Sequence, residues 1–255
     1  MTTVQSEDRE GGVRLLTLHR PPANAITAGL MADLASALEA AEADDSVRAV
    51  VLTGAGRFFS GGLDIRAPGL GEGLGGGNPF APLRTAMLRL LGFPKPTIAM
   101  IGGHAIAGGL IIALACDYRL ALDGDYRIGL NEVALGASFP RAAFETVRLR
   151  LTHQQASELL LGAAIYPASE AVRLGVAAEL LSDDSFEETA MRRAARLGAF
   201  PSDAYAHTKL ALVREALMRI EEETEEEAMR GAAVWMTPES VAARAAQAKK
   251  LAGGA

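Results

Sequence analysis

Two glycine pairs in this sequence could expose backbone amides that bind an anion. The first pair opens the apolar run "GGLIIALAC", which predicts a helix that begins at Gly108. The first amides of a helix have no partner within it, and the helix dipole adds partial positive charge there. Without side chains at Gly108 and Gly109, a ligand oxygen can approach these amides closely. The alternative is that the glycines only let a helix and a strand pack closely, and one isolated pair favours that alternative.

The second glycine pair makes the anion-binding interpretation stronger. It lies in "GRFFSGGLD", directly after the β-branched run "VRAVVLTG", and it predicts a bend in which the amide of Leu63 is left unpaired. If the two bends converge, the amides of Leu63 and Gly108 point at one carbonyl oxygen. Such a pair is an oxyanion hole, in which each donor typically contributes about 2.7 to 4 kcal/mol of transition-state stabilisation.

Five motifs in a fixed order resemble the crotonase family, also called the enoyl-CoA hydratase/isomerase superfamily. They are "RPPANAIT", "LTGAGRFFSGGLD", "KPTIAMIGGHAIAGG", "ACDYRLA" and "GLNEVALGASFP". The resemblance covers roughly residues 10–180. Any one motif is weak evidence, whereas five in order and at the family spacing are specific.

The resemblance implies an α/β fold built as a spiral of ββα units, with an α-helical C-terminal region that forms trimers. We expect the spiral over 1–195 and the helical extension over 196–255, assembled as a homotrimer or a dimer of trimers. The implied partner is an acyl-CoA thioester, and since coenzyme A is part of that substrate, no separate cofactor is expected. In the family the C-terminal helix often gives an aromatic residue and a lysine to a neighbouring subunit's CoA. Here the C-terminal segment keeps Lys249 and Lys250 but has no aromatic residue.

By motif position, the resemblance also assigns residues to the site. The oxyanion donors are the amides of Leu63 and Gly108, and the catalytic carboxyl group is that of Glu132, in "GLNEVALG". Asn131 is expected to orient Glu132, and Arg66 is a candidate phosphate contact or an ordinary surface residue. The residues expected to bind the substrate are Ala23, Ala25, Ser60, Gly62, Asp64, Ile65 and Pro140. For Asp64 a second interpretation is that its carboxylate fixes its own loop.

One departure from the family pattern affects the expected reaction. Hydratases carry a second glutamate three residues after the oxyanion glycine, where this chain has Ile111. Hydration is served by two carboxylates, one to activate water and one to deliver a proton, whereas moving a double bond needs one base that takes and returns a proton. Isomerisation is therefore favoured slightly over hydration. The alternatives are a catalytically silent acyl-CoA-binding protein and an acyl-CoA thioesterase or decarboxylase.

Other features favour ordinary roles or exclude function classes. His104 is expected to be a hydrogen-bonded packing residue, and the single cysteine, Cys116, to fill space in the core. No His, Cys and carboxylate cluster has the spacing of a metal site. The net charge is −6 and the basic residues are scattered, so we expect no nucleic-acid partner. Glycines and His104 interrupt the apolar stretch 97–116, so no membrane contact is expected, and a polar N-terminus without a signal sequence predicts a cytoplasmic protein.

The elements that position these residues alternate between strands and helices. Strands are predicted over 13–20, 47–54 and 97–103, and a helix after Thr27, its expected N-cap. This alternation indicates parallel strands covered by helices. The glycine-rich segment 68–79 is predicted to be a mobile surface loop, either a linker or a substrate lid. From about residue 152 onward the pattern predicts helices.

Overall fold

The β-branched runs form the larger of two sheets. The computed structural model describes residues 2–64 and 80–253, and within them this sheet has the strand order β1-β2-β3-β5-β7-β10. Its neighbouring strands are parallel except for the antiparallel pair β1 and β2. The strands are β1 (Val4–Arg9), β2 (Val13–Leu18), β3 (Ala49–Gly54), β5 (Thr97–Ile101), β7 (Tyr118–Leu122) and β10 (Glu179–Leu181).

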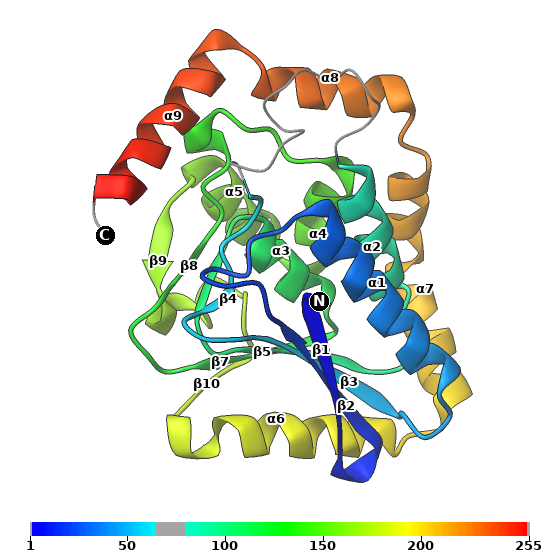
Figure 1. Ribbon diagram of the computed structural model, residues 1–255. Coiled ribbons are helices and arrows are strands. Elements are labelled where there is room, and N and C mark those ends of the chain that lie inside the picture. The colour runs from blue at the N-terminus through cyan, green and yellow to red at the C-terminus, as the bar shows by residue number, and fades with distance from the viewer. Residues whose placement is uncertain (1, 65–79, 254–255) are drawn as a thin grey trace.

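The central strands β3 and β5 are apolar on both faces, as expected for strands covered on both sides. Alternate residues of β3 belong to different clusters, with Val50 and Leu52 in the main core and Val51 in a second cluster beneath the sheet. Helix α6 (Asp183–Gly198) covers the second cluster with Phe186 and Leu197. Figure 1 shows α6 lying along one face of the sheet, with α1, α2 and α3 beyond the other.

The smaller sheet arises from a repeated unit. Its strands are ordered β4-β6-β8-β9, with β4, β6 and β8 parallel and β9 antiparallel to β8. Each of the units β3-β4-α2, β5-β6-α3 and β7-β8-α4 places one strand in each sheet and then a helix, which is a spiral of ββα units. The strands of this sheet are β4 (Phe58–Ser60), β6 (His104–Ile106), β8 (Arg127–Gly129) and β9 (Ile165–Pro167).

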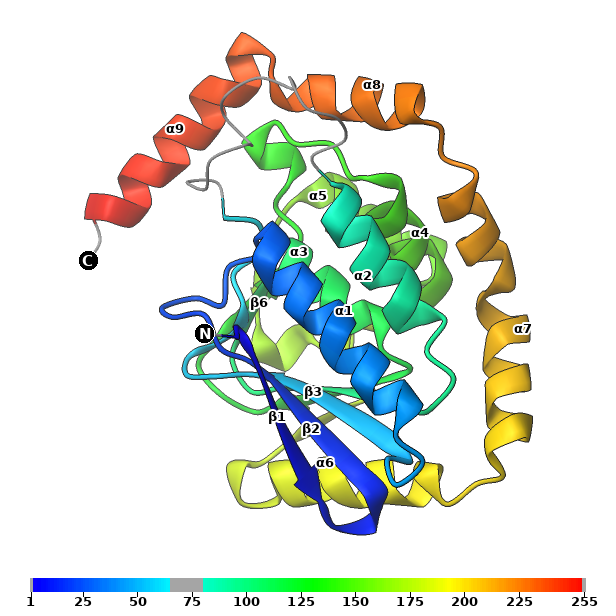
Figure 2. The same cartoon turned by 45° about the vertical axis from the view of Figure 1, so that its right-hand side comes forward.

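The remaining helices surround this core. The last three follow one another around its outside, α7 along one side, α8 across the end and α9 beyond it (Figure 2). Three short 3₁₀ helices are η1 (Glu10–Gly12), η2 (Val133–Leu135) and η3 (Ala168–Glu170). The α-helices not yet given are α1 (Ala28–Ala43), α2 (Ala81–Leu91), α3 (Gly108–Ala115), α4 (Arg141–Arg150), α5 (His153–Gly162), α7 (Ser202–Glu221), α8 (Glu225–Trp235) and α9 (Pro238–Gly253).

The structure confirms the three predicted strands and the predicted helix starts. Thr27 is the N-cap of α1, where its hydroxyl accepts a hydrogen bond from the amide of Leu30, and α3 begins at Gly108. The prediction of helices alone after residue 152 is wrong, because β9 and β10 lie in that part of the chain. Three-residue strands carry too few residues for a period-2 pattern to be visible in the sequence.

Two further predictions concern the glycine-rich loop and the boundary of the helical extension. The predicted loop over 68–79 lies outside the described residues. The proposed division at residue 195 falls within α6, which packs on the large sheet, and the helical extension begins with α7. Within the described residues, no helix combines the length and apolarity needed to cross a membrane.

Candidate active site

Three bends leave the same edge of the small sheet. Because β4, β6 and β8 are parallel neighbours, the segments that follow their carboxyl ends lie side by side. After β4 comes the bend that carries Leu63, after β6 the start of α3 at Gly108, and after β8 the segment with Glu132. A hydrogen bond of 2.8 Å from the amide of Ala107 to the carbonyl of Gly129 joins the last two. The topology therefore gathers the three residues predicted to be catalytic at one edge.

The two glycine bends converge at short range. A Cβ atom placed on Gly62 would lie 3.3 Å from the amide nitrogen of Gly108. A Cβ atom placed on Gly108 would lie 3.9 Å from the amide nitrogen of Leu63. Gly62 has a φ of +84°, a left-handed conformation that glycine adopts without strain. The two glycine bends are thus in contact, with the amides of Leu63 and Gly108 near each other.

Within the described residues, neither amide donates a hydrogen bond to the backbone. Ile26 forms an isolated bridge with Leu63. The amide of Ile26 donates to the carbonyl of Gly62, and the carbonyl of Ile26 accepts from the amide of Asp64. The amide of Leu63, between these two bonds, donates to no backbone carbonyl of the described residues. Gly108 is the first residue of α3, so its amide has no partner within the helix. Both donors remain available to a ligand.

The glycines at the start of α3 have different roles. A Cβ atom on Gly109 would lie 2.2 Å from the carbonyl oxygen of Ser60, so this glycine allows close packing of helix on strand. A Cβ atom on Gly108 would meet Ile26 Cδ1 at 2.9 Å, the flexible end of a side chain, and it would face the amide of Leu63. The packing interpretation is therefore correct for Gly109, whereas the position of Gly108 agrees with oxyanion binding.

A buried hydrogen-bond network shapes the bend before Leu63. The hydroxyl of Ser60, which is fully buried, donates to the carbonyl of Asn24 at 2.8 Å and accepts from the amide of Gly62 at 3.3 Å. The side-chain amide of Asn24 donates to the carbonyl of Phe58 at 2.7 Å. The carbonyl of Ala23 accepts from the amide of Gly61 at 2.8 Å. Here the side chain of Ser60 holds the loop, and its substrate-binding role stays a prediction.

Asp64 is held by an ion pair. Its carboxylate lies 2.7 Å from a guanidinium nitrogen of Arg20, and another nitrogen of that group donates to the carbonyl of Ala25 at 3.2 Å. Arg20 thus links the turn that carries Ala23 and Ala25 to the bend that carries Leu63. The interpretation of Asp64 as a loop-fixing residue agrees with this contact to Arg20.

Glu132 is a buried carboxyl group with an orphan oxygen. The residue is only 7% exposed, and its Oε2 has no hydrogen-bond partner among the described residues. Burial disfavours the charged form and raises the pKa of Glu132 from its ordinary 4.5 to about 7, an effect that a backbone hydrogen bond partly opposes. A carboxyl group with this pKa can both accept and return a proton near neutral pH.

Two neighbours of the predicted catalytic groups, Asn131 and Ile111, bear on the expected chemistry. The Oδ1 of Asn131 is buried without a partner in the described part of the chain, so no contact of this oxygen orients Glu132. Ile111 is 2% exposed and packs in the main core, on the first turn of α3. No carboxylate occupies that position.

His104 and Cys116 have the ordinary roles expected of them. The Nδ1 of His104 accepts from the amide of Arg127 at 3.0 Å, and its ring stacks on Phe58 with centroids 4.6 Å apart. Burial lowers the pKa of His104. Cys116 is fully buried, and burial raises the pKa of its thiol to about 12, so it is not a nucleophile.

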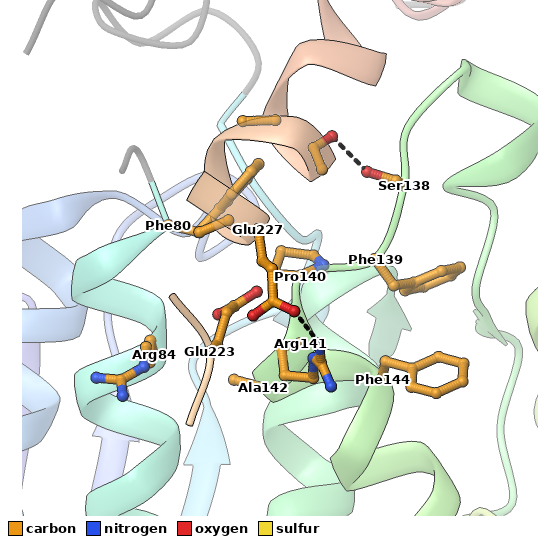
Figure 3. Close-up of a pocket in the computed structure, with 13 residues that line it drawn as sticks. Phe80, Arg84, Ser138, Phe139, Pro140, Arg141, Ala142, Phe144, Glu223 and Glu227 are labelled. Atoms are coloured by element: carbon orange, nitrogen blue, oxygen red, sulfur yellow. Dashed lines mark hydrogen bonds and ion pairs between the residues drawn. The ribbon is translucent and has the colours of Figure 1, made fainter. Parts of the chain in front are cut away.

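Pro140 lines a pocket beside these bends (Figure 3). The pocket encloses about 690 Å³ of empty space, part of which is open to solvent, and an ion pair of 3.7 Å between Arg141 and Glu227 lies in its wall. Phe80 and Ala232 line it and also belong to a small buried cluster against which Leu63 packs. Its other apolar lining includes Phe139, Phe144 and Ala228.

The structure thus brings most of the predicted site residues together around one edge. Ile65 and Arg66 lie outside the described residues. Sequence reasoning missed Arg20 and Asn24, which hold the two loops in place. The signal for Asn24 was its position in the turn "PPANAI", because its φ of +49° is one that asparagine tolerates better than most residues.

In the described part of the chain, no three His, Cys, Asp or Glu side chains lie close enough together to hold a metal ion.

Comparisons with known proteins show the family to which the chain belongs. The family model described as enoyl-CoA hydratase/isomerase matches residues 8–240. A probable enoyl-CoA hydratase of Bacillus subtilis is 36% identical over 165 residues, which are 64% of this chain and 64% of that protein, just under two thirds of its length. The human mitochondrial enoyl-CoA delta isomerase 1 is 31% identical over 216 residues, covering 82% of this chain and 70% of that protein.

A solved structure matches almost the whole chain. The crystal structure of human mitochondrial Δ3-Δ2-enoyl-CoA isomerase superposes with a TM-score of 0.91 at 25% sequence identity, and the match covers 99% of each chain. The family match spans most of the chain, and the fold, with its two sheets and C-terminal helices, is the crotonase fold. The chain is therefore a member of the enoyl-CoA hydratase/isomerase family, the crotonase family.

Proposed function

We propose that this protein is a Δ3,Δ2-enoyl-CoA isomerase that uses one glutamate. The single observation that carries the proposal is that one sheet edge gathers a buried carboxyl group and two backbone amides that have no backbone acceptor among the described residues. The amides of Leu63 and Gly108 bind the thioester oxygen and stabilise the negative charge that forms when a proton leaves C2. Glu132 takes that proton.

The reaction then needs only a second proton transfer by the same carboxyl group. Loss of the C2 proton from a 3-enoyl thioester gives a dienolate whose negative charge extends from the thioester oxygen to C4. Glu132, now protonated, returns the proton to C4, the double bond moves from C3–C4 to C2–C3, and the carboxylate is restored. A pKa of about 7 suits both steps, because the carboxyl group is neither too weak a base nor too weak an acid.

The choice of isomerisation over hydration is supported by Ile111. Hydration is served by a second carboxylate that positions water, and this position of α3 holds a buried aliphatic side chain instead. The similarity to a human isomerase over nearly the whole chain supports the same choice. Hydration is the second candidate, favoured by the 36% identity to a probable hydratase.

The acyl chain is proposed to extend from the oxyanion hole toward the pocket beside Pro140. Phe80 and Ala232 connect the two regions, since both line the pocket and both belong to the cluster that packs on Leu63. The apolar part of the lining suits a hydrocarbon chain, and the charged side chains of Arg84, Arg141, Glu223 and Glu227 line the rest. A trimeric or hexameric assembly and a cytoplasmic location remain predictions, and light scattering of the purified protein tests the assembly.

Product analysis tests the proposed reaction. The protein is incubated separately with a 3-enoyl-CoA and a 2-enoyl-CoA, and the products are identified by mass and NMR. Isomerisation gives a 2-enoyl-CoA of unchanged mass, hydration gives a 3-hydroxyacyl-CoA heavier by one water, and thioester hydrolysis releases free CoA. A protein that binds acyl-CoA but turns over none of these substrates would contradict the assignment.

A further inference from the structure

The loop that follows Glu132 is bound at two points by helix α8. The hydroxyl of Ser138 donates to the carbonyl of Gly231 at 2.7 Å, a contact that Figure 3 shows as a dashed line. The indole N–H of Trp235 donates to the carbonyl of Ser138 at 3.0 Å. One residue of the loop is therefore fixed through both its side chain and its backbone.

The same loop is joined to Glu132 by short backbone hydrogen bonds. The amides of Leu135 and Ala137 both donate to the carbonyl oxygen of Glu132 at 2.9 Å. Residues 132–138 therefore behave as one hydrogen-bonded unit. A contact that fixes Ser138 also limits how far the backbone of Glu132 can move.

Trp235 contacts the oxyanion side of the site as well. Its ring is 6% exposed and belongs to a buried cluster with Phe80, Ala137 and Ala232, against which Leu63 packs. The ring centroids of Trp235 and Phe80 are 5.1 Å apart. The side chain of Trp235 thus binds the loop of the proposed base and belongs to the cluster on which Leu63 packs.

Helix α9 holds Trp235 and the loop from the other side. The guanidinium of Arg244 lies over the Trp235 ring, 5.5 Å from its centroid, and also donates to the Trp235 carbonyl. Ser240 is buried against Gly136, where a Cβ atom would approach its Cα to 2.5 Å. The contacts of both C-terminal helices therefore meet at this loop.

We infer that Trp235 is a positioning residue, whose N–H and ring hold Glu132 and Leu63 at a fixed separation. The inference rests on the proposed function, because it concerns the geometry of that reaction. Trp235 itself takes no part in proton transfer. A displacement of about 1 Å between reacting groups can cost on the order of a hundredfold in rate. The two hydrogen bonds that tie Ser138 to helix α8, together called the clamp, can therefore affect turnover.

The variant Trp235→Phe separates positioning from packing. It keeps an aromatic ring in the cluster and under Arg244, and it removes the N–H that binds the carbonyl of Ser138. Val234→Ala is the matched control, since Val234 is the neighbouring residue of α8 and is 45% exposed. Ser138→Ala removes the other clamp bond and serves as the second test variant.

Two measurements on these variants test the inference. In Trp235→Phe and in Ser138→Ala, hydrogen exchange at the amides of Leu135 and Ala137 is expected to be at least tenfold faster than in the wild type. Exchange in the strands of the large sheet is expected to be unchanged. For turnover of 3-enoyl-CoA, kcat is expected to fall about tenfold while KM stays within twofold, and Val234→Ala is expected to match the wild type.

Different negative results would overturn the positioning role of Trp235 and the proposed function. Wild-type exchange and wild-type kcat in both test variants would overturn the clamp. Faster exchange throughout the molecule with an unchanged kcat would also overturn it, because this is the result of a role in stability alone. A wild-type protein that turns over no enoyl-CoA would overturn the proposed function, while exchange at Leu135 and Ala137 would still decide whether the clamp exists.

Discussion

The amide nitrogen of Gly108 lies 3.3 Å from the position that a Cβ atom would take on Gly62. These residues are far apart in the sequence and follow parallel strands β4 and β6, which are neighbours in the small sheet. The closeness therefore results from the ββα spiral, which returns each short strand to the same edge. Because Gly62 has no side chain, the two bends can approach this closely; a Cβ atom there would also meet Ala107 Cβ at 2.8 Å.

Adding a side chain at Gly108, close to the amide of Leu63, is expected to abolish most of the activity. In Gly108→Ala the new methyl group would lie 3.9 Å from the amide of Leu63 and would displace only the flexible Cδ1 of Ile26. We expect a folded protein whose kcat is lower by about 10²- to 10³-fold, the loss typical of one oxyanion donor. Steady-state kinetics and thermal unfolding measure the two effects. Gly162→Ala, where a Cβ atom meets nothing within 4 Å, is the control, and a fully active Gly108→Ala would contradict the oxyanion assignment.

The pH dependence of the reaction is expected to report the pKa of Glu132. The base must be ionised, and burial raises its pKa to about 7. The ionised fraction rises from roughly a tenth at pH 6 to roughly nine tenths at pH 8, so kcat/KM should increase about tenfold over this range. Glu132→Gln should lower kcat by about 10²- to 10⁴-fold and remove this dependence. A wild-type profile that is flat between pH 6 and 8 would show that another group is the base.

The same carboxyl group links stability to pH. Its pKa is about 7 in the folded protein and near 4.5 when it is exposed to water. Between these values the folded protein holds a proton that the unfolded chain has lost, so the free energy of unfolding falls as pH rises. The full loss, present above pH 7, is on the order of 3 kcal/mol.

The side chain introduced by Glu132→Gln cannot ionise, so this variant should not lose free energy of unfolding as the pH rises. The variant is therefore expected to be more stable than the wild type at pH 8, with a smaller difference at pH 5, as measured by urea unfolding at both values. The exposed Glu222→Gln is the control, since its side chain is in water in both states. A Glu132→Gln effect that is equal at pH 5 and pH 8 would mean that the carboxyl group is not perturbed by burial.

A buried ion pair attaches helix α7 to the core. The ammonium group of Lys209 lies 2.8 Å from Asp117, which also accepts hydrogen bonds from the Tyr205 hydroxyl and the Thr97 amide, each at 3.0 Å. Lys209→Met leaves the buried carboxylate of Asp117 with Arg150, 3.6 Å away, as its remaining cation, so the free energy of unfolding should fall by at most about 3 to 5 kcal/mol, the loss typical of a broken buried pair. Urea unfolding measures the loss. The exposed His207→Met on the same helix is the control, and a loss below about 1 kcal/mol would contradict a structural role for the pair.

Much of the fold was readable from the sequence because long elements carry strong patterns. The apolar runs of β2, β3 and β5, the N-cap Thr27 and the glycine start of α3 are local signals, and the structure agrees with each. The strands β4, β6, β8 and β9 have three residues each, and they exist because pairing partners from other turns of the spiral complete them. Such strands are set by tertiary contacts and leave no periodic pattern in the sequence.

The candidate site likewise combines residues that motifs predict and pairs of residues that only the fold brings together. Gly108, Leu63 and Glu132 were found through motifs, because their chemistry depends on local features such as a helix start, a bend and a carboxyl group. The ion pair of Arg20 with Asp64 and the hydrogen bond of Trp235 with Ser138 join residues that are distant in sequence. A single sequence carries no signal for such pairs, since either residue alone resembles an ordinary surface or core side chain.

A crystal structure with a saturated acyl-CoA bound would test the central claim most directly. This ligand has the thioester group but no double bond to move, so it remains intact. The account predicts that the thioester oxygen lies about 2.7 to 3.1 Å from the amide nitrogens of both Leu63 and Gly108, with the carboxyl group of Glu132 facing C2. A thioester oxygen bound away from either amide, or a Glu132 carboxyl group on the far side of the ligand, would contradict it.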